Sequence, residues 1–201
     1  MKTVLKFGID EAGRGPLAGP VAVAVFGMRE GFELPDFPVG KDSKKMSEKE
    51  REKWAAIFMQ EKKRGNVFFE VALSSAKVID SKGIVGAIAH AMEACLSKLE
   101  KEGIATPAST ILLDGALKAP SRFISQKTII KGDEKEMLIG CASIVAKVSR
   151  DRFMKKISTT YPDYGLHIHK GYGTKKHREA ISSFGLSEVH RKSFCKNITK
   201  Y

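Results

Sequence analysis

The sequence predicts an α/β protein, in which helices cover a central sheet and a small C-terminal subdomain follows. Short apolar runs rich in β-branched residues recur up to about residue 130, bounded by glycine, proline or acidic residues. Longer segments carry apolar residues at helical spacing. The tail instead mixes glycine, histidine, lysine and aromatic residues around one short helix. We therefore expect a main domain over residues 1–160 and a subdomain over residues 161–201.

The strands are expected where the apolar runs lie. Residues 4–9 form the first, which ends at the acidic pair Asp10 and Glu11, and residues 21–26 are uniformly apolar, as in a buried strand. Three later runs are predicted as strands in the same way: residues 66–72, 110–113 and 127–130.

Four helices are expected. Ser47 and Glu50 form a capping-box pattern, which predicts a helix over residues 48–62. Apolar residues recur at helical spacing over residues 83–101, and residues 139–157 have the composition of a largely buried helix. A short helix is expected over about residues 174–184.

Charge points to a polyanionic partner. The chain has 35 Lys and Arg against 23 Asp and Glu, a net charge of +12, and its isoelectric point is near 9.6. This excess favours nucleic acid as the partner. No run approaches the ~18 apolar residues of a membrane span, and no signal peptide is visible at the N-terminus.

The three cysteines argue against two kinds of site. Cys95, Cys141 and Cys195 lie far apart and are odd in number, which excludes a CxxC zinc site and disfavours a disulfide framework. This usage is typical of the reducing cytosol, so we expect a cytoplasmic protein.

Four carboxylates stand where predicted strands end. Asp10 and Glu11 follow the first strand, Asp114 follows a later one and Asp133 comes soon after the last. Ligands of α/β folds bind at strand ends, and converging carboxylates need a cation, for which oxygen ligands favour Mg²⁺ or Mn²⁺. For any single acid, capping or turn formation is the commoner explanation, although the adjacent pair together with two more acids favours a site.

A glycine-rich segment follows the first strand. Residues 13–18 formally satisfy the dinucleotide-binding pattern, yet Pro16 and Pro20 prevent the helix that this motif requires, so we reject that interpretation. Glycines around Arg14 would instead let backbone approach a phosphate or sugar, with a guanidinium beside it. A plain tight turn with an exposed arginine is an equal alternative.

Two further segments are candidate contacts for nucleic acid. Tyr172 lies between glycines near several bases and is suited to stack on a sugar or base, although a partly buried loop tyrosine is as good an explanation. Residues 41–45 could hold phosphates, but a solvated basic loop is the commoner case. His167 and His169 have no partner at zinc spacing, so we expect no zinc site there.

These segments together closely resemble ribonuclease HII. The resemblance starts with the block GIDEAGRGPLAGPV at residues 8–21 and extends in order over essentially the whole chain. The later blocks are DSKK (42–45), LDG (113–115), KGD (131–133), ASIVAKVSRDR (142–152), YG (164–165), HKGY (169–172) and HRKSF (190–194).

The resemblance implies a ribonuclease H-like fold, with a mixed central sheet flanked by helices. It implies an endonuclease that cuts the RNA strand of RNA–DNA hybrids and cuts 5′ of single ribonucleotides embedded in duplex DNA. The family's catalytic and metal-binding carboxylates fall on Asp10, Glu11, Asp114 and Asp133. Two divalent ions, Mg²⁺ or Mn²⁺, would hold the scissile phosphate and leave 5′-phosphate and 3′-hydroxyl ends. Asp151, flanked by bases, is a rival for the fourth acid that we interpret as structural.

The resemblance also assigns substrate contacts. The element that senses the 2′-hydroxyl falls on Gly13, Arg14 and Gly15, and the substrate-sensing tyrosine falls on Tyr172. The remaining expected substrate-binding residues are Ser43, Lys44, Lys147 and Lys170. Residues 1–160 would then be the catalytic domain and residues 161–201 a substrate-binding subdomain.

Two departures from the family are minor. Cys141 replaces the usual alanine, and Gly83 replaces the usual asparagine, which would loosen the start of the following helix. The expected partners are RNA–DNA hybrid and ribonucleotide-containing duplex DNA, with no membrane, bound by a monomer. A junction resolvase of the same fold would lack the Gly-Arg-Gly element and Tyr172, whereas a non-catalytic hybrid-binding module would have lost acids.

Overall fold

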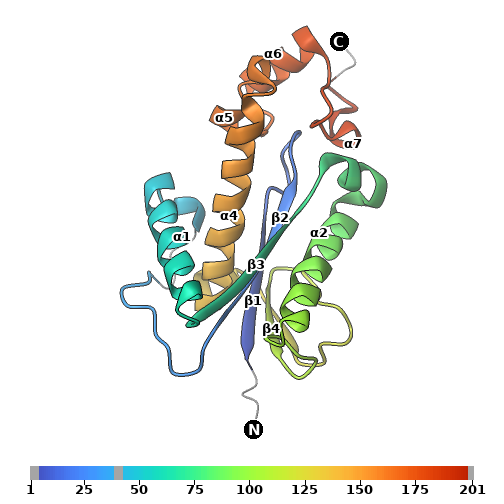
Figure 1. Cartoon of the computed structure of the whole chain (residues 1–201). Coiled ribbons are helices and arrows are strands. Elements are labelled where there is room, and N and C mark those ends of the chain that lie inside the picture. Colours follow the sequence, from blue (N-terminus) through green and yellow to red (C-terminus); the bar gives the residue numbers. More distant parts are fainter. Residues whose placement is uncertain (1–4, 39–42, 199–201) are drawn as a thin grey trace.

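The fold is built on a five-stranded mixed sheet with helices on both faces (Figure 1). The computed structural model describes residues 5–38 and 43–198, with the exception of the Lys44 side chain. The strands are β1 (Lys6–Ala12), β2 (Val21–Met28), β3 (Val67–Ser74), β4 (Thr110–Asp114) and β5 (Gln126–Ile129), in the order β3-β2-β1-β4-β5. β1, β2 and β3 pair antiparallel, and β4 lies parallel to both β1 and β5.

The long helices follow the predictions closely. They are α1 (Glu48–Lys63), α2 (Ala76–Lys101), α4 (Met137–Ser158) and α6 (Lys175–Phe184). The predicted capping box of α1 is confirmed: the Glu50 amide donates to Ser47 Oγ at 3.1 Å, and the Ser47 amide donates to Glu50 Oε2 at 2.8 Å. Within the described residues, none of the helices has both the length and the apolar character needed to cross a bilayer.

Two apolar cores, one on each face of the sheet, hold these layers together. α2 packs on one face with side chains such as Phe7 and Ile9, whereas α1 and α4 pack on the other face with Ala24 and Phe26 (Figure 1). A Cβ atom on Gly8 would lie 2.2 Å from the Leu138 carbonyl carbon. Glycine is required here because the backbones of β1 and α4 meet, which fixes α4 across the middle of the sheet.

Two predicted boundaries were wrong in an informative way. β1 does not end before Asp10 but continues to Ala12, because Glu11 and Ala12 still pair with residues of β2. α2 begins at Ala76 rather than at Gly83, where it kinks with a φ of 69°. With a ψ of 166°, Gly83 has a backbone conformation that is essentially restricted to glycine, so glycine suits the kink at this position.

The C-terminal segment packs on the end of α4. It contains the short elements η2 (Pro162–Tyr164), α5 (Leu166–His169) and α7 (Lys192–Cys195) in addition to α6. A separate apolar cluster forms here around Met154, Tyr164 and Leu166 and includes Ala18 from the glycine-rich loop. The elements η1 (Ser43–Lys45) and α3 (Gly132–Lys135), which the sequence did not predict, lie between the larger ones.

Candidate active site

Asp10 is buried on the face of the sheet that α4 covers. Phe7 and Ile9 point into the core beneath α2, and because strand side chains alternate, Asp10 points the other way. There its carboxylate accepts a hydrogen bond from the Ser143 hydroxyl of α4. Its Oδ1 also accepts the amide of Glu11 at 2.7 Å.

Asp114 lies beside Asp10 on the neighbouring strand. Ile9 pairs with Leu113 in the parallel register of β1 and β4, so the two aspartates that follow them stand side by side on one face. The Gly132 amide donates to Asp114 Oδ1 at 2.7 Å. This bond ties the end of β4 to the start of α3.

Asp133 reaches the same region through a tight turn before α3. Lys131 adopts a left-handed φ of 55°, and a Cβ on Gly132 would lie 2.6 Å from Ile139 Cδ1 and 3.3 Å from Asp114 Oδ1. Glycine is needed at this close approach, which places Asp133 directly after the residue that binds Asp114. The Asp133 side chain is buried.

Glu11 joins this group from the other side of the strand. Alternation along β1 points its side chain away from Asp10, and its Oε1 lies 3.3 Å from Arg14 Nη1. The structure thus brings Asp10, Asp114 and Asp133 to one face and places Glu11 at the adjoining edge of the same strand end.

The electrostatics of the acids favour a bound cation. Burial raises the pKa of Asp10 well above its usual value, and the charges of Glu11 and Asp114 raise it further, whereas the Ser143 bond opposes the rise. Converging carboxylates of this kind are stabilised in the charged form by a divalent ion.

The acids do not form one closed coordination sphere. Among residues 5–38 and 43–198, no three His, Cys, Asp or Glu side chains group closely enough to hold a metal ion on their own. Mg²⁺ and Mn²⁺ do not need such a cage, because at nucleotide sites they bind one or two carboxylates and take water and phosphate oxygens for the rest. An all-oxygen set around the Asp10–Asp114 pair fits ions of this class.

Two buried arginines bind backbone carbonyls of the glycine-rich loop that follows β1. Arg191 donates to three carbonyls of the loop: to Gly19 from Nε at 2.9 Å, to Arg14 from Nη1 at 2.9 Å and to Gly13 from Nη2 at 2.7 Å. Arg150 donates to two more, to Pro20 from Nε at 2.8 Å and to Ala18 from Nη2 at 3.2 Å. The loop is therefore rigid, and it is attached to α4 and to the C-terminal segment.

The structure of the protein requires glycine at residue 13 but not at residue 15. Gly13 has a φ of 90°, and a Cβ there would lie 1.9 Å from Arg150 Nε. Gly15 is outside the left-handed region and a Cβ would meet nothing within 4 Å. The Arg14 side chain between them is half exposed.

Tyr172 is joined to this loop through the backbone. The amides of Leu17 and Ala18 both donate to the Gly171 carbonyl, at 2.8 and 3.3 Å. The Tyr172 ring is 46% exposed, and its centroid lies 5.9 Å from Arg150 Cζ. An aromatic face is thus available to solvent beside the Gly-Arg-Gly element.

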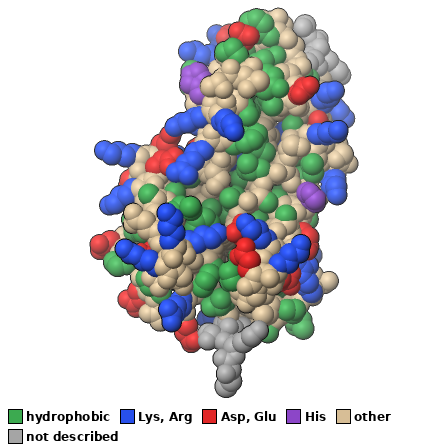
Figure 2. All heavy atoms as spheres, viewed as in Figure 1, with side chains coloured by type: hydrophobic (Ala, Val, Ile, Leu, Met, Phe, Trp, Pro, Cys, Tyr) green, Lys and Arg blue, Asp and Glu red, His purple; other side chains and the backbone are tan. Residues whose placement is uncertain are grey.

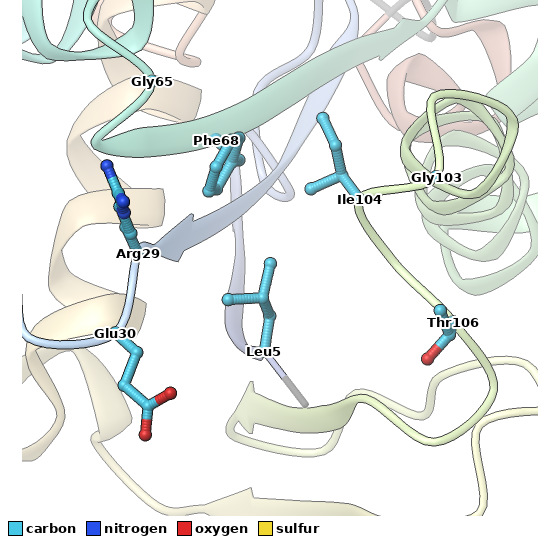
Figure 3. A pocket seen from close by; sticks show the side chains of 8 residues that line it. All are labelled: Leu5, Arg29, Glu30, Gly65, Phe68, Gly103, Ile104 and Thr106. Atoms are coloured by element: carbon cyan, nitrogen blue, oxygen red, sulfur yellow. The ribbon is translucent and has the colours of Figure 1, made fainter. Parts of the chain in front are cut away.

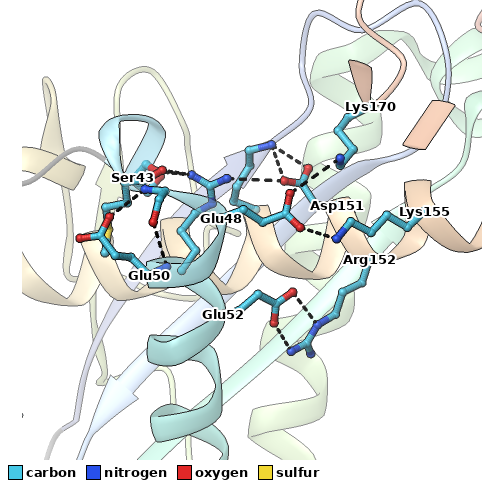
Figure 4. A network of polar contacts seen from close by, with 12 residues as sticks. Ser43, Glu48, Glu50, Glu52, Asp151, Arg152, Lys155 and Lys170 are labelled. Atoms are coloured by element: carbon cyan, nitrogen blue, oxygen red, sulfur yellow. Dashed lines mark hydrogen bonds and ion pairs between the residues drawn. The ribbon is translucent and has the colours of Figure 1, made fainter. Parts of the chain in front are cut away.

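The remaining predicted contacts lie in a polar network between α1, α4 and the C-terminal segment (Figure 4). Ser43 is buried and its Oγ lies 2.7 Å from Ser143 Oγ, which links η1 to Asp10. Lys147 donates to both oxygens of Asp151 at 2.6 and 2.7 Å. Lys170 donates to the His167 carbonyl at 2.6 Å.

Asp151 belongs to this network. Arg51 Nη2 lies 3.9 Å from its Oδ2, in addition to the bonds from Lys147. Along α4 it is eight residues beyond Ser143, about 12 Å from the residue that binds Asp10. Its surroundings suit a structural carboxylate.

Three residues that support the site were not recognised as supporting residues from the sequence. Ser143, Arg150 and Arg191 all lie in blocks that carry the family resemblance, but their types alone do not indicate burial. Arg150 and Arg191 are fully buried, which is uncommon for arginine and visible only once the fold is known.

A pocket of about 590 Å³ is at the other end of the sheet (Figure 3). It is lined by residues near the start of β1 and the end of β2, including Leu5, Arg29 and Phe68. The carboxylates lie instead at the far ends of β1 and β4. Lys and Arg side chains are spread widely over the face shown in Figure 2.

Known proteins match the chain over nearly its full length. The family model described as ribonuclease HII matches residues 7–197. A ribonuclease HII of Caldicellulosiruptor bescii is 44% identical over 191 residues, which cover 95% of this chain and 86% of the relative.

Two solved structures share the fold. Ribonuclease H2 from Pyrococcus horikoshii OT3 aligns with a TM-score of 0.73 at 24% identity, over 98% of this chain and 97% of that one. Bst-RNase HIII in complex with Mn²⁺ aligns with a TM-score of 0.66 at 18% identity, over 98% and 70% of the two chains.

Proposed function

The chain belongs to the ribonuclease HII family, and on this basis we propose which bond it cuts and with which residues. It is an endoribonuclease that acts on RNA–DNA hybrids and a hydrolase of phosphodiester bonds. The finer proposal is that it also cuts 5′ of a single ribonucleotide embedded in duplex DNA. The products would carry 5′-phosphate and 3′-hydroxyl ends.

One observation carries this proposal: the acids and the glycine-rich loop lie at the same end of the sheet. β1 and β4 run parallel, so Asp10 and Asp114 lie where both strands end, and the Gly-Arg-Gly element follows β1 directly. A phosphate at the acids would therefore have its sugar near Gly13–Gly15 and a neighbouring sugar near Tyr172. This arrangement favours the ribonuclease over a junction resolvase, which would need no reader of the 2′-hydroxyl.

The family depends on divalent metal, and the donor set of this chain fits it. We assign Asp10 and Asp114 as shared ligands, with Glu11 and Asp133 completing the two metal shells. Mg²⁺ or Mn²⁺ would supply an activated water and neutralise charge on the phosphate. The Gly132 amide and the Ser143 hydroxyl hold Asp114 and Asp10 in place.

The loop would read the sugar. The space beside Gly15 is open, so its backbone groups, next to those of Gly13, can approach a 2′-hydroxyl, and the exposed Arg14 guanidinium can reach a phosphate. Tyr172 would pack on the adjacent deoxyribose, where a second hydroxyl would crowd its ring. This accounts for cutting at an isolated ribonucleotide that is followed by DNA.

The other proposed contacts differ in how directly they can act. Lys170 would have to exchange its bond to the His167 carbonyl and its ion pair with Glu48, 3.9 Å away, for a contact with a phosphate. Lys147 would likewise have to exchange its bonds to Asp151. Ser43 would act through its bond to Ser143. The Lys44 side chain lies outside the described part of the structure. Residues 161–201, whose described part packs with the loop, would form the substrate-binding subdomain.

The decisive test uses three duplexes that differ at one nucleotide. The first contains one ribonucleotide, the second a 2′-O-methyl ribonucleotide at the same position, and the third is all DNA. We expect one cut, 5′ of the ribonucleotide, in the first duplex only, with a 3′-hydroxyl end that a polymerase can extend. Equal cutting of the methylated strand would show that the 2′-hydroxyl is not read. Cutting of the all-DNA duplex would favour a DNA nuclease of the same fold.

A further inference from the structure

Three histidine rings lie next to one another close to the backbone of Tyr172. The rings of His169 and His177 stack with centroids 4.3 Å apart, and those of His177 and His190 are tilted with centroids 5.3 Å apart. His177 and His190 are fully buried. The proposed chemistry uses none of them.

The hydrogen bonds of His190 fix which of its nitrogens carries the proton. The Ser187 amide can only donate, and it points at His190 Nδ1 at 3.0 Å. Nδ1 is therefore the acceptor nitrogen, and a neutral ring must carry its proton on Nε2. Protonating Nδ1 as well would set two donors face to face.

His190 in turn fixes the tautomer of His177. The two Nε2 atoms lie 3.1 Å apart, so one donates and the other accepts. Since His190 Nε2 bears the proton, His177 Nε2 accepts, and His177 carries its proton on Nδ1. That nitrogen lies 2.9 Å from the Tyr172 carbonyl, which can only accept. The bonds therefore run in one direction from Ser187 to Tyr172.

His169 supports the residue before Tyr172 in the same manner. The Gly171 amide donates to His169 Nδ1 at 3.2 Å, so the proton lies on Nε2, which donates to the Tyr164 carbonyl at 2.8 Å. The carbonyl of Gly171 is the one that binds the glycine-rich loop. Each ring must be neutral for these bonds to hold together.

We propose that His177 is a positioning residue for Tyr172, held in the Nδ1-protonated tautomer by the chain of bonds from Ser187 through His190. The Tyr172 carbonyl also accepts the Thr174 amide at 2.8 Å, and the two bonds together fix the backbone from which the exposed ring extends. His177 thus acts on selectivity for single ribonucleotides, a role that rests on the proposed function of Tyr172. It touches neither substrate nor metal.

The surroundings of the rings keep them neutral. Burial lowers the pKa of His177 to about 4, and burial likewise lowers the pKa values of His169 and His190. The neighbouring groups whose charge acts on these pKa values are all basic: His167, His169, Lys170 and His190. His177 should therefore stay neutral from pH 8 to below pH 6.

Ring ¹⁵N spectra of the wild-type protein test the tautomers without any activity measurement. The chain has five histidines, so single His→Gln variants can assign the signals. At pH 7 and at pH 6 we expect the Nδ1-protonated pattern for His177, which is the rarer form in water, and the Nε2-protonated pattern for His169 and His190. An Nε2-protonated or charged His177 would overturn the proposal.

Two variants of His177 separate positioning from simple packing. His177→Asn places an amide donor where Nδ1 lies, so it can still bind the Tyr172 carbonyl, whereas the amide of His177→Gln lies at the Nε2 position. The measured quantity is the ratio of kcat/KM for one embedded ribonucleotide to kcat/KM for a continuous hybrid. We expect the ratio to stay within about twofold for Asn and to fall about two- to tenfold for Gln, the size of one lost hydrogen bond. His90→Gln, at an exposed position on α2, is the matched control.

The outcomes separate this proposal from the function on which it rests. If Tyr172→Ala lowers the ratio and His177→Gln does not, the positioning role is wrong and the role of Tyr172 stands. If neither variant lowers the ratio, both are wrong. If the ratio falls as far for His177→Asn as for His177→Gln, the volume of the side chain matters rather than the Nδ1 proton. The positioning role is then wrong. Rescue by Asn together with the predicted spectra supports it.

Discussion

Gly15→Ala is expected to leave the fold intact and to damage the reaction. Nothing lies within 4 Å of the position where a Cβ on Gly15 would be, and its φ is outside the left-handed region. The structure of the protein alone therefore gives no reason for glycine at residue 15. Glycine is needed there only if a group outside the protein comes close to the backbone, and we propose that this group is the ribose of the substrate.

The structure predicts opposite effects on stability for alanine at Gly15 and alanine at Gly13. Alanine at a compatible glycine position raises the free energy of unfolding by roughly 0–1 kcal/mol, because the unfolded chain loses freedom. Gly13→Ala instead forces a positive φ, which costs about 1–2 kcal/mol, and its Cβ would overlap Arg150 Nε at 1.9 Å. Since Arg150 is held by the Pro20 carbonyl, the total cost should exceed about 3 kcal/mol.

The effect of Gly15→Ala on activity comes from displacement of the sugar. A methyl group that shifts the reacting phosphate by about 1 Å can cost about 100-fold in rate. Urea unfolding of wild type, Gly13→Ala and Gly15→Ala, followed by kcat/KM on one embedded ribonucleotide, gives both quantities. Wild-type cleavage by a stable Gly15→Ala variant would refute close approach of the sugar at this residue.

Three further predictions concern the acids, the bases and the histidines. Asp133→Asn should abolish cleavage with little change in substrate affinity, whereas Asp151→Asn should destabilise the fold by about 3–5 kcal/mol and leave folded molecules active; the reverse pattern would make Asp151 the fourth acid. Lys170→Ala should reduce the slope of log affinity against log salt by about 0.9, and an unchanged slope would remove its phosphate contact. Burial lowers the pKa of His177 from 6.5 to about 4 in the folded state, so the unfolded state binds more protons as pH falls between these two values. Unfolding free energy should therefore fall from pH 6.5 toward pH 4, by at most about 3 kcal/mol for this residue, in urea titrations compared with His177→Asn.

The sheet and the long helices could be predicted because their signals are local. An apolar run such as that in β2 and a capping box such as that before α1 need no distant partner to be recognised. The end of β1 was misplaced for the opposite reason. Asp10 and Glu11 are polar, and only pairing with β2 keeps them in the strand. Long-range pairing there overrides the local pattern.

The acids were found in the sequence, but their arrangement was not. Nothing in the sequence states that Ile9 pairs with Leu113, and this register alone makes neighbours of Asp10 and Asp114. The turn that delivers Asp133 depends on Lys131 in a left-handed conformation, which is not apparent from its residue type. Family resemblance supplied the four positions where physical reasoning from the sequence supplied only candidates.

The two buried arginines show why the support of the site escapes a local analysis. Arg191 is 178 residues from Gly13 in the chain, and both it and Arg150 bind backbone carbonyls of the loop. Burial, and after it the charge of Arg150, lowers the pKa of Arg191 to about 9, so the two cations destabilise each other. Positive charge buried beneath the loop favours an anion above it, because attraction is stronger where water is excluded. A substrate phosphate bound at the Arg14 guanidinium beside the loop would relieve part of that cost, which links the stability of the loop to the substrate that it is proposed to hold.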